Sequence, residues 1–245
     1  METAEHIKTI AEEGRLLARA AEAAGTDAKV PTCPGWHVRD LLRHVTMVHR
    51  WATAFVAEGR TSYHPAEEPT ELDGAELVTW FREGHERLVE TLAGARPDME
   101  CWTFLPAPSP LAFWARRQAH ETTIHRVDAE SALPATPGVI PTELAVDGIE
   151  ELLLGFHARG RSKVRSDVPR LLRVRATDAG RTWTVRISQE PTVTEREGAG
   201  EADCELSGPA ARLYLSLWNR LPFPSLTGDA SLAALWRDRS GITWS

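Results

Sequence analysis

The first 132 residues contain four stretches of helical periodicity separated by short proline-containing breaks. Of all the features of the sequence, this pattern restricts the possible folds most. In the second stretch, apolar residues recur every three or four positions, which gathers them on one face of an α-helix. These residues are Val38, Leu41, Val45, Val48, Ala52 and Phe55. The predicted helices cover about residues 4–24, 37–58, 70–94 and 110–132. Four long helices with short connections predict a helical bundle.

The sequence changes character after residues 133–141, a segment with three prolines that we interpret as a linker. A predicted helix near residues 142–159 is followed by runs of β-strand type, one of which alternates apolar and polar residues. The predicted strands are 171–177, 181–188 and 202–208. The predicted fold class is therefore α+β with two domains. Residues 1–140 form a four-helix bundle and residues 141–245 a small α+β domain.

The composition limits the classes of partner. The chain has 245 residues and a formal net charge of −7, so there is no electrostatic reason to expect a nucleic-acid or membrane-surface partner. No apolar run approaches the roughly 20 residues that span a bilayer, and the N-terminal residues lack the apolar region of a signal peptide. We therefore expect a cytoplasmic monomer that binds neither nucleic acid nor membrane.

The cysteines give no sign of a disulfide framework. Cys33, Cys101 and Cys204 are odd in number, widely spaced and without a CxxC pair. This pattern supports neither disulfides nor a cysteine-rich zinc site. It is compatible with a reducing cytoplasm.

The fourth predicted helix carries a column of polar side chains. At 100° per residue, five residues fall within about 60° of one another on one helix face. They are Trp114, Arg117, Glu121, His125 and Asp128. No broad apolar stripe competes with this column for the core, so its residues either face solvent or line a polar interior site.

A metal site is one interpretation of this column. Glu121 and His125 are four residues apart, so their side chains meet on one helix face. On the second helix, His44 lies at the margin of the apolar stripe, where it can supply a third ligand from inside a bundle. Two imidazoles and one carboxylate leave a coordination position open, as in catalytic zinc sites. His49 and His120 are rival ligand candidates.

A solvated ladder of salt bridges is the alternative interpretation, and spacing by itself favours it. In that case Arg117, Glu121, His125 and Asp128 pair with one another on an outer helix face. If the site binds a metal instead, Asp128 and Arg117 are candidates to orient His125 and Glu121 by hydrogen bonds from outside the ligand set.

Two segments resemble a known family. VPTCPGWHVRDLLRHVTMVHRWA (30–52) and FWARRQAHETTIHRVDAE (113–130) are similar to the two signature segments of the mycothiol-dependent maleylpyruvate isomerase family. The resemblance implies a DinB-like four-helix bundle that binds a divalent metal, usually zinc, and a C-terminal α+β domain with some likeness to sterol-carrier folds. It assigns the metal ligands to His44, Glu121 and His125. We interpret PTCPGW as a structural turn that leads into the second helix.

The resemblance also implies a chemistry. Family members use mycothiol, an actinobacterial thiol, which the metal holds as a thiolate that adds to an electrophilic small molecule. A functional arginine falls on Arg220, in a segment similar to LYLSLWNR (213–220). It is expected to pair with a substrate carboxylate, and the alternative role is a surface or interdomain salt bridge. The best expectation is a cis–trans isomerase acting on maleylpyruvate. A mycothiol S-transferase and a non-enzymatic ligand-binding protein are the alternatives.

Overall fold

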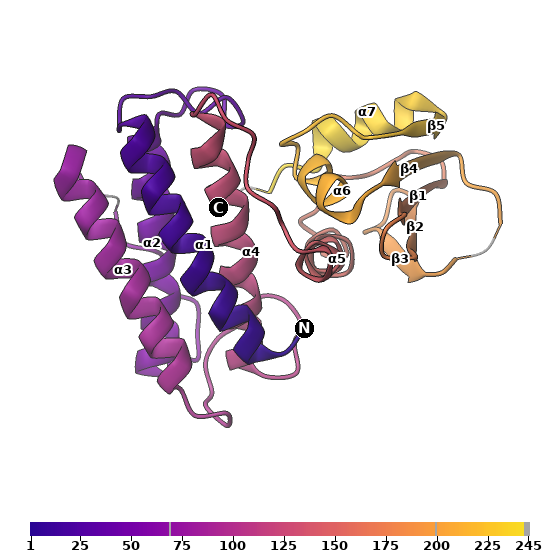
Figure 1. Ribbon diagram of the computed structural model, residues 1–245. Helices are drawn as coiled ribbons and strands as arrows, with labels where there is room; N and C mark the ends of the chain where they lie inside the picture. Colours follow the sequence, from indigo (N-terminus) through magenta and orange to yellow (C-terminus); the bar gives the residue numbers. More distant parts are fainter. Residues whose placement is uncertain (69, 199, 243–245) are drawn as a thin grey trace. The chain divides into compact units, whose positions relative to one another are not determined.

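The computed structural model describes residues 1–68, 70–198 and 200–242. The chain divides into two compact units, Met1–Gly138 and Val139–Ser245. Each unit has its own core and its own set of secondary-structure elements (Figure 1).

The first unit is a bundle of four helices, and this confirms the predicted fold class. The helices are α1 (Thr3–Ala24), α2 (Val38–Glu58), α3 (Gly74–Gly94) and α4 (Pro110–Ser131). Helix α1 packs against α3 and α4, and α2 packs against the same two helices. Helix α4 begins where the sequence predicts, because the Ser109 side chain accepts a hydrogen bond from the backbone N–H of Ala112 and Pro110 occupies the first turn.

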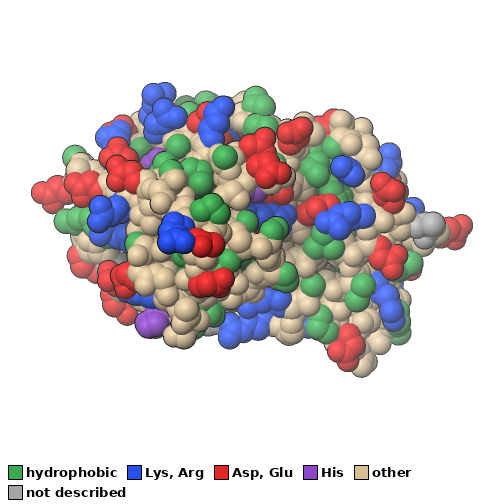
Figure 2. All heavy atoms as spheres, turned by 90° about the horizontal axis from the view of Figure 1, so that it is seen from below, with side chains coloured by type: hydrophobic (Ala, Val, Ile, Leu, Met, Phe, Trp, Pro, Cys, Tyr) green, Lys and Arg blue, Asp and Glu red, His purple; other side chains and the backbone are tan. Residues whose placement is uncertain are grey.

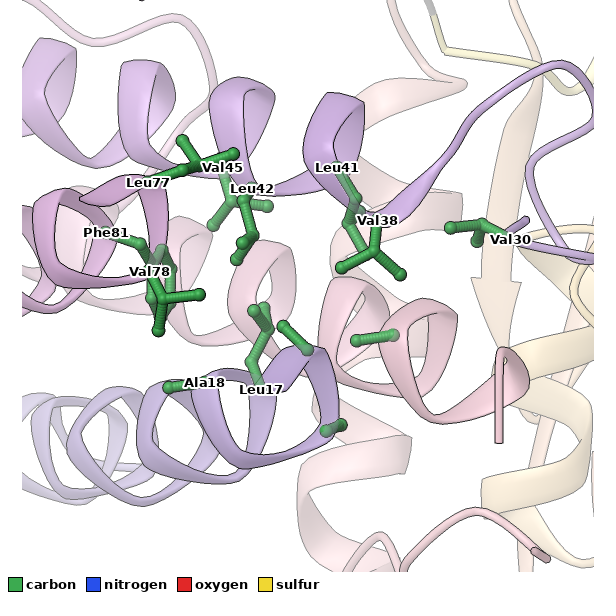
Figure 3. Packing of buried hydrophobic residues seen from close by; sticks show 13 residues of the cluster. Leu17, Ala18, Val30, Val38, Leu41, Leu42, Val45, Leu77, Val78 and Phe81 are labelled. Atoms are coloured by element: carbon green, nitrogen blue, oxygen red, sulfur yellow. The ribbon is translucent and has the colours of Figure 1, made fainter. Parts of the chain in front are cut away.

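Apolar side chains from α1, α2 and α3, together with Ala129 of α4, meet at the centre of this bundle (Figure 3). Leu17 of α1 packs beside Leu42 and Val45 of α2, and Phe81 of α3 belongs to the same cluster. All four side chains are fully buried. Each contributes about 1.5–3 kcal/mol through removal of its apolar surface from water. This core fixes α2 against α3 and so determines which face of α2 points towards α4.

Helix α4 differs from the other three because it is buried on nearly every face. The residues opposite the polar column are also inaccessible, including Arg126, whose side chain has no exposed surface. The guanidinium of Arg126 donates to Glu13 of α1 at 2.6 Å and to Glu130 at 2.7 Å. A fully buried charge is tolerated because carboxylates pair with it. The absence of an apolar stripe on α4 therefore reflects a polar interior rather than an exposed helix.

The second unit contains a mixed five-stranded sheet and several helices. It begins with α5 (Thr142–Glu150), which continues as the π-helix η1 (Glu151–Phe156). The strands are β1 (Arg170–Ala176), β2 (Arg181–Ile187), β3 (Val193–Arg196), β4 (Cys204–Gly208) and β5 (Leu226–Gly228). Their order in the sheet is β3-β2-β1-β4-β5, with β1 and β4 parallel and the other pairs antiparallel. Helices α6 (Ala210–Leu217) and α7 (Ala230–Arg239) complete the unit.

The three predicted strands correspond to β1, β2 and β4, whose alternate residues enter the core. Trp183, Val185 and Ile187 of β2 are buried, as are Leu172 and Val174 of β1. Helix α6 packs against β1 and β4. Strands β3 and β5, short strands at the two edges of the sheet, were not predicted from the sequence. None of their residues is buried, so they lack the alternation of burial that marks the central strands.

The surface carries both signs of charge. Figure 2 shows acidic and basic side chains interspersed over one face of the molecule, without a large patch of a single sign. Among the described residues, no helix combines the length and the hydropathy needed to cross a membrane.

Candidate metal centre

Two imidazoles and one carboxylate converge between α2 and α4. The Nε2 atom of His44, from α2, lies 3.2 Å from the Oε1 atom of Glu121 on α4. The Nε2 atom of His125, one turn further along α4, lies 3.2 Å from the same oxygen. One potential ligand atom from each of the three residues lies within 4.8 Å of the other two. The structure thus brings together the three residues to which the sequence assigned metal binding.

Local helix geometry and the bundle core explain this convergence. Glu121 and His125 share a face of α4 because they are four residues apart. On α2, His44 follows the buried residues Leu41 and Leu42, so its ring lies at the edge of the face that packs on the bundle. The His44 side chain keeps 19% of its surface exposed, against 6% for Glu121. The carboxylate is therefore buried, while His44 is partly exposed.

The alternative of a solvated salt-bridge ladder is wrong. Arg117 is 1% exposed and Asp128 has no exposed surface. Arg117 donates from Nη2 to Oε2 of Glu121 at 3.4 Å, and Asp128 accepts from Nδ1 of His125 at 2.8 Å. The polar column lines the interior of the bundle because α2 covers it.

Burial and mutual pairing shift the pKa values of Glu121 and His125. Burial raises the pKa of Glu121, but hydrogen bonds from His125 and His44 outweigh this effect and hold the pKa well below its usual value. Burial lowers the pKa of His125, but the carboxylates of Asp128 and Glu121 raise it to about 9. Without a metal, Glu121 is therefore an anion and His125 a cation at neutral pH. A bound dication would take the place of the proton on Nε2 of His125.

The distances fit a small divalent metal. A tetrahedral zinc ion with ligand bonds of about 2.0–2.1 Å places its ligand atoms about 3.4 Å apart. The two distances to Glu121, both 3.2 Å, are close to this spacing. Two imidazole nitrogens and one carboxylate oxygen form the ligand set of catalytic zinc sites, in which a further position remains for substrate or water. His44, Glu121 and His125 could therefore hold such an ion.

The turn before α2 contacts the site in a way that its sequence did not indicate. PTCPGW is predicted to be a structural turn, yet Thr32 donates a hydrogen bond to Oδ1 of Asp128 at 2.6 Å. The Trp36 ring lies 5.2 Å from the His44 ring and 6.4 Å from the His125 ring. Thr32 is 96 residues from Asp128, and no periodicity relates the two. The type of turn predicts a bend but not the groups that its side chains contact.

The rival histidines have other environments. His49 is fully buried, and its Nε2 atom lies 3.0 Å from the Thr122 hydroxyl oxygen. Burial, together with the nearby His85, lowers the pKa of His49 to about 3, so this imidazole is neutral. The buried His120 ring lies 6.0 Å from the ring of His6 on α1. Neither His49 nor His120 belongs to the group formed by His44, Glu121 and His125.

Arg220 belongs to the second unit, just beyond the C-terminal end of α6. Its Nη1 atom donates to the backbone oxygen of Trp218 at 2.8 Å. The preceding residue, Asn219, has a left-handed backbone with φ of 62°. The Asn219 amide donates to the Arg237 oxygen and to Ser240 Oγ. The chain direction at Arg220 is therefore fixed by a turn that is anchored to α7.

Both units match the two domain types of one protein family. Residues 7–130 match the mycothiol maleylpyruvate isomerase N-terminal domain, and residues 143–235 match the MDMPI C-terminal domain. No curated protein sequence matches the chain. The fold is similar to crystal structures of the mycothiol-dependent maleylpyruvate isomerase and of a histidine-to-alanine mutant of that enzyme.

The structural likeness extends over most of each chain, although few residues are identical. The mutant matches with a TM-score of 0.62 at 14% identity and covers 90% of both chains. The unmutated enzyme matches with a TM-score of 0.59 at 15% identity and covers 89% of both chains. At such low identity the structural likeness establishes the fold, while the two domain matches establish the family. The chain belongs to the mycothiol maleylpyruvate isomerase family.

Proposed function

We propose that this protein is a zinc- and mycothiol-dependent enzyme that acts on an electrophilic small molecule, with maleylpyruvate or a similar unsaturated acid as the substrate. The observation that carries the proposal is the convergence of ligand atoms from His44, Glu121 and His125, of which Glu121 is buried and His44 is partly exposed. Zinc bound there would supply a Lewis acid that keeps a coordinated thiol deprotonated.

The charges around the site favour an anionic further ligand. With a dication bound, His44 and His125 are neutral, and the fixed charges are those of Arg117, Glu121 and Asp128. These groups together with the dication leave one net positive charge. A thiolate neutralises this charge, whereas a neutral thiol does not. The burial of Arg117 and Asp128 strengthens the preference because solvent screens buried charges poorly.

The residues of the bundle would hold the ligand set in place. Arg117 contacts Oε2 of Glu121 and leaves Oε1 facing the two imidazoles. Asp128 accepts a hydrogen bond from the protonated Nδ1 of His125, which leaves Nε2 as the ligand atom. Outer partners of this kind typically contribute about 10–100-fold in metal affinity.

The reaction needs a thiol that can add and then leave. A thiolate that added to the cis double bond would form a sulfur–carbon bond and move the π electron pair onto the conjugated carbonyl as an enolate, which would leave a single bond free to rotate. Return of this electron pair would expel the same thiolate and restore the double bond in the trans form, so the thiol would be regenerated. We assign to Arg220 the pairing with a substrate carboxylate, for which a guanidinium offers two parallel donors. An S-transferase would release the adduct instead and consume the thiol.

Metal content is the decisive experiment. We expect about one zinc per chain in untagged wild-type protein by elemental analysis, and loss of zinc in Glu121→Ala and His125→Ala. His64→Ala is the matched control, because His64 is exposed and outside the cluster. A wild-type protein that holds no metal after incubation with zinc, cobalt or nickel would contradict the proposal.

Turnover assays then distinguish the chemical outcomes. Isomerisation of maleylpyruvate with catalytic mycothiol supports the isomerase. Stoichiometric loss of mycothiol with formation of an adduct identifies the S-transferase. Tight binding of metal and thiol without turnover of any electrophile would indicate a ligand-binding protein and would contradict the enzymatic part of the proposal.

A further inference from the structure

The turn before α2 contacts both imidazoles of the candidate metal centre without offering a ligand atom itself. From one end of the turn, Thr32 donates to Oδ1 of Asp128 at 2.6 Å. The other carboxylate oxygen of Asp128, Oδ2, lies 2.8 Å from Nδ1 of His125. A chain of hydrogen bonds therefore runs from Thr32 through a fully buried carboxylate to a proposed ligand.

From the other end of the turn, the Trp36 ring contacts the two imidazoles. It is stacked on the His125 ring at an interplanar angle of 17°, and it lies 5.2 Å from the His44 ring at 59°. The two imidazoles are themselves 5.1 Å apart, edge to face. Three aromatic rings therefore fix one another's orientation on the side of the site where His44 is partly exposed.

Backbone hydrogen bonds make the turn stiff enough to hold these side chains. Cys33 N–H donates to the Val30 oxygen at 3.0 Å, Trp36 N–H donates to the Cys33 oxygen at 3.0 Å, and Val30 N–H donates to the Trp36 oxygen at 2.9 Å. Gly35 has φ of 89°, a conformation that other residues adopt only with strain. Thr32 and Trp36 thus keep a fixed separation.

We propose that Thr32 and Trp36 are positioning residues of the metal centre, and this inference rests on the proposed function. Thr32 stops the Asp128 carboxylate from rotating away from Nδ1 of His125, so that Nε2 of His125 keeps pointing at Glu121. Trp36 holds the planes of the His44 and His125 rings. The turn contributes to metal affinity and geometry although it lies outside the ligand set.

The test compares closely matched threonine variants. Thr32→Val removes the hydroxyl and keeps the shape, and Thr32→Ser restores the hydroxyl. Thr123→Val is the control on α4, because Thr123 is also buried and its hydroxyl donates to the backbone oxygen of Ala119 rather than to Asp128. Zinc affinity is measured by competition with a chelator, and the geometry of the site is followed by the visible absorption of bound cobalt.

We expect Thr32→Val to weaken zinc binding about tenfold, the lower end of the range for outer partners, and to change the cobalt spectrum. Thr32→Ser and Thr123→Val should match the wild type in both measurements. We expect Trp36→Leu to alter the cobalt spectrum and Trp36→Phe to preserve it. Circular dichroism and thermal unfolding of the metal-free proteins show whether each variant is folded.

The outcomes separate this inference from the proposed function. One outcome is that the wild type binds zinc, and that Thr32→Val and Trp36→Leu match it in zinc affinity and in the spectrum of bound cobalt. This outcome overturns the positioning role and leaves the metal centre intact. If Thr32→Ser is as weak as Thr32→Val, the hydroxyl is not the important group, and the role of Thr32 is overturned. If the wild type binds no metal, the proposed function fails first and the positioning role fails with it.

Discussion

At the residue scale, the centre of the site is one carboxylate with three cationic or potentially cationic neighbours. Glu121 faces His44 and His125 through Oε1 and Arg117 through Oε2. The anion is stable in a buried position because these groups offset the cost of removing it from water. Its charge is therefore the property on which metal binding depends most.

Replacing Glu121 with glutamine tests the importance of this charge. Glu121→Gln keeps the size of the side chain and removes the charge, so we expect zinc affinity to fall by more than about 100-fold, beyond the effect of outer partners. Glu58→Gln is the control, because Glu58 is an exposed carboxylate that pairs with Arg60 in the same unit. Isothermal titration of both variants with zinc measures the difference. Equal affinity in Glu121→Gln and wild type would rule out the carboxylate as a ligand.

His49, which is not one of the three proposed metal ligands, predicts a dependence of stability on pH. The pKa of His49 is about 3 in the folded protein, against 6.5 for an ordinary histidine. Below pH 6.5 the unfolded chain binds a proton at His49 and the folded chain does not. The contribution of neutral His49 to the free energy of unfolding is therefore fully present above pH 6.5 and is lost as the pH falls towards 3.

The expected loss from His49 is about 2 kcal/mol between pH 7 and pH 5. Glutamine is neutral over this range. The free energy of unfolding of His49→Gln should therefore fall less between pH 7 and pH 5 than that of the wild type, and the difference between the two falls should be about 2 kcal/mol. Urea unfolding at a series of pH values gives both curves. Parallel curves for the two proteins would mean that His49 titrates equally in the folded and unfolded states.

At the scale of the elements, α4 is held to α1 by a buried ion pair as well as by apolar packing. Arg126 lies between Glu13 and Glu130, and its guanidinium also donates to the backbone oxygen of Gly138. The carboxylate of Glu13 is buried too, and burial raises its pKa although Arg126 opposes the shift. This pair fixes the rotation of α4 and hence the face that Glu121 and His125 present to α2.

Removal of the cation should therefore destabilise the bundle. We expect Arg126→Met to reduce the free energy of unfolding by about 3–5 kcal/mol, because a buried carboxylate loses its cationic partner. Arg82→Met is the control, since Arg82 and Glu22 form a half-exposed pair between α3 and α1. Its expected effect is about 0.5 kcal/mol. Chemical denaturation measures both, and similar values for the two variants would show that burial does not strengthen the Arg126 pair.

At the scale of the whole molecule, the candidate metal centre belongs entirely to the first of two compact units. A ligand that binds only the folded state stabilises the unit that contains its site. Zinc should therefore raise the unfolding temperature of the bundle through His44, Glu121 and His125, with no direct effect on the unit that contains the sheet.

Calorimetry with and without zinc tests this expectation. At a free zinc concentration 1,000 times the dissociation constant, the stabilisation is about 4 kcal/mol. His125→Ala should show no zinc-dependent shift. Removal of zinc by a chelator should return the wild type to the lower unfolding temperature. An equal shift in wild type and His125→Ala would place zinc binding at another site.

The sequence by itself determined the elements whose pattern is local. Periodicity identified all four helices of the bundle, and Ser109 and Pro110 located the start of α4. Runs of β-strand type identified the three central strands, and residues 181–188 among them alternate apolar and polar side chains. Helix spacing placed Glu121 and His125 on one face and His44 at the margin of the apolar stripe of α2, and the family resemblance assigned metal binding to the same three residues. Local patterns suffice here because a helix or a half-buried strand repeats its burial at a fixed interval.

Only the tertiary structure decided which polar residues are interior and what they contact. Spacing by itself favours an exposed salt-bridge ladder for the column on α4, but α2 covers this column in the bundle. Arg126 is buried with a carboxylate partner because Glu13 approaches from α1. Thr32 meets Asp128 across 96 residues, through a turn whose sequence predicts only a bend. These pairings are long-range and specific to the packed helices. No periodicity along the chain records them, because the partner of a buried charge is determined by which helices meet.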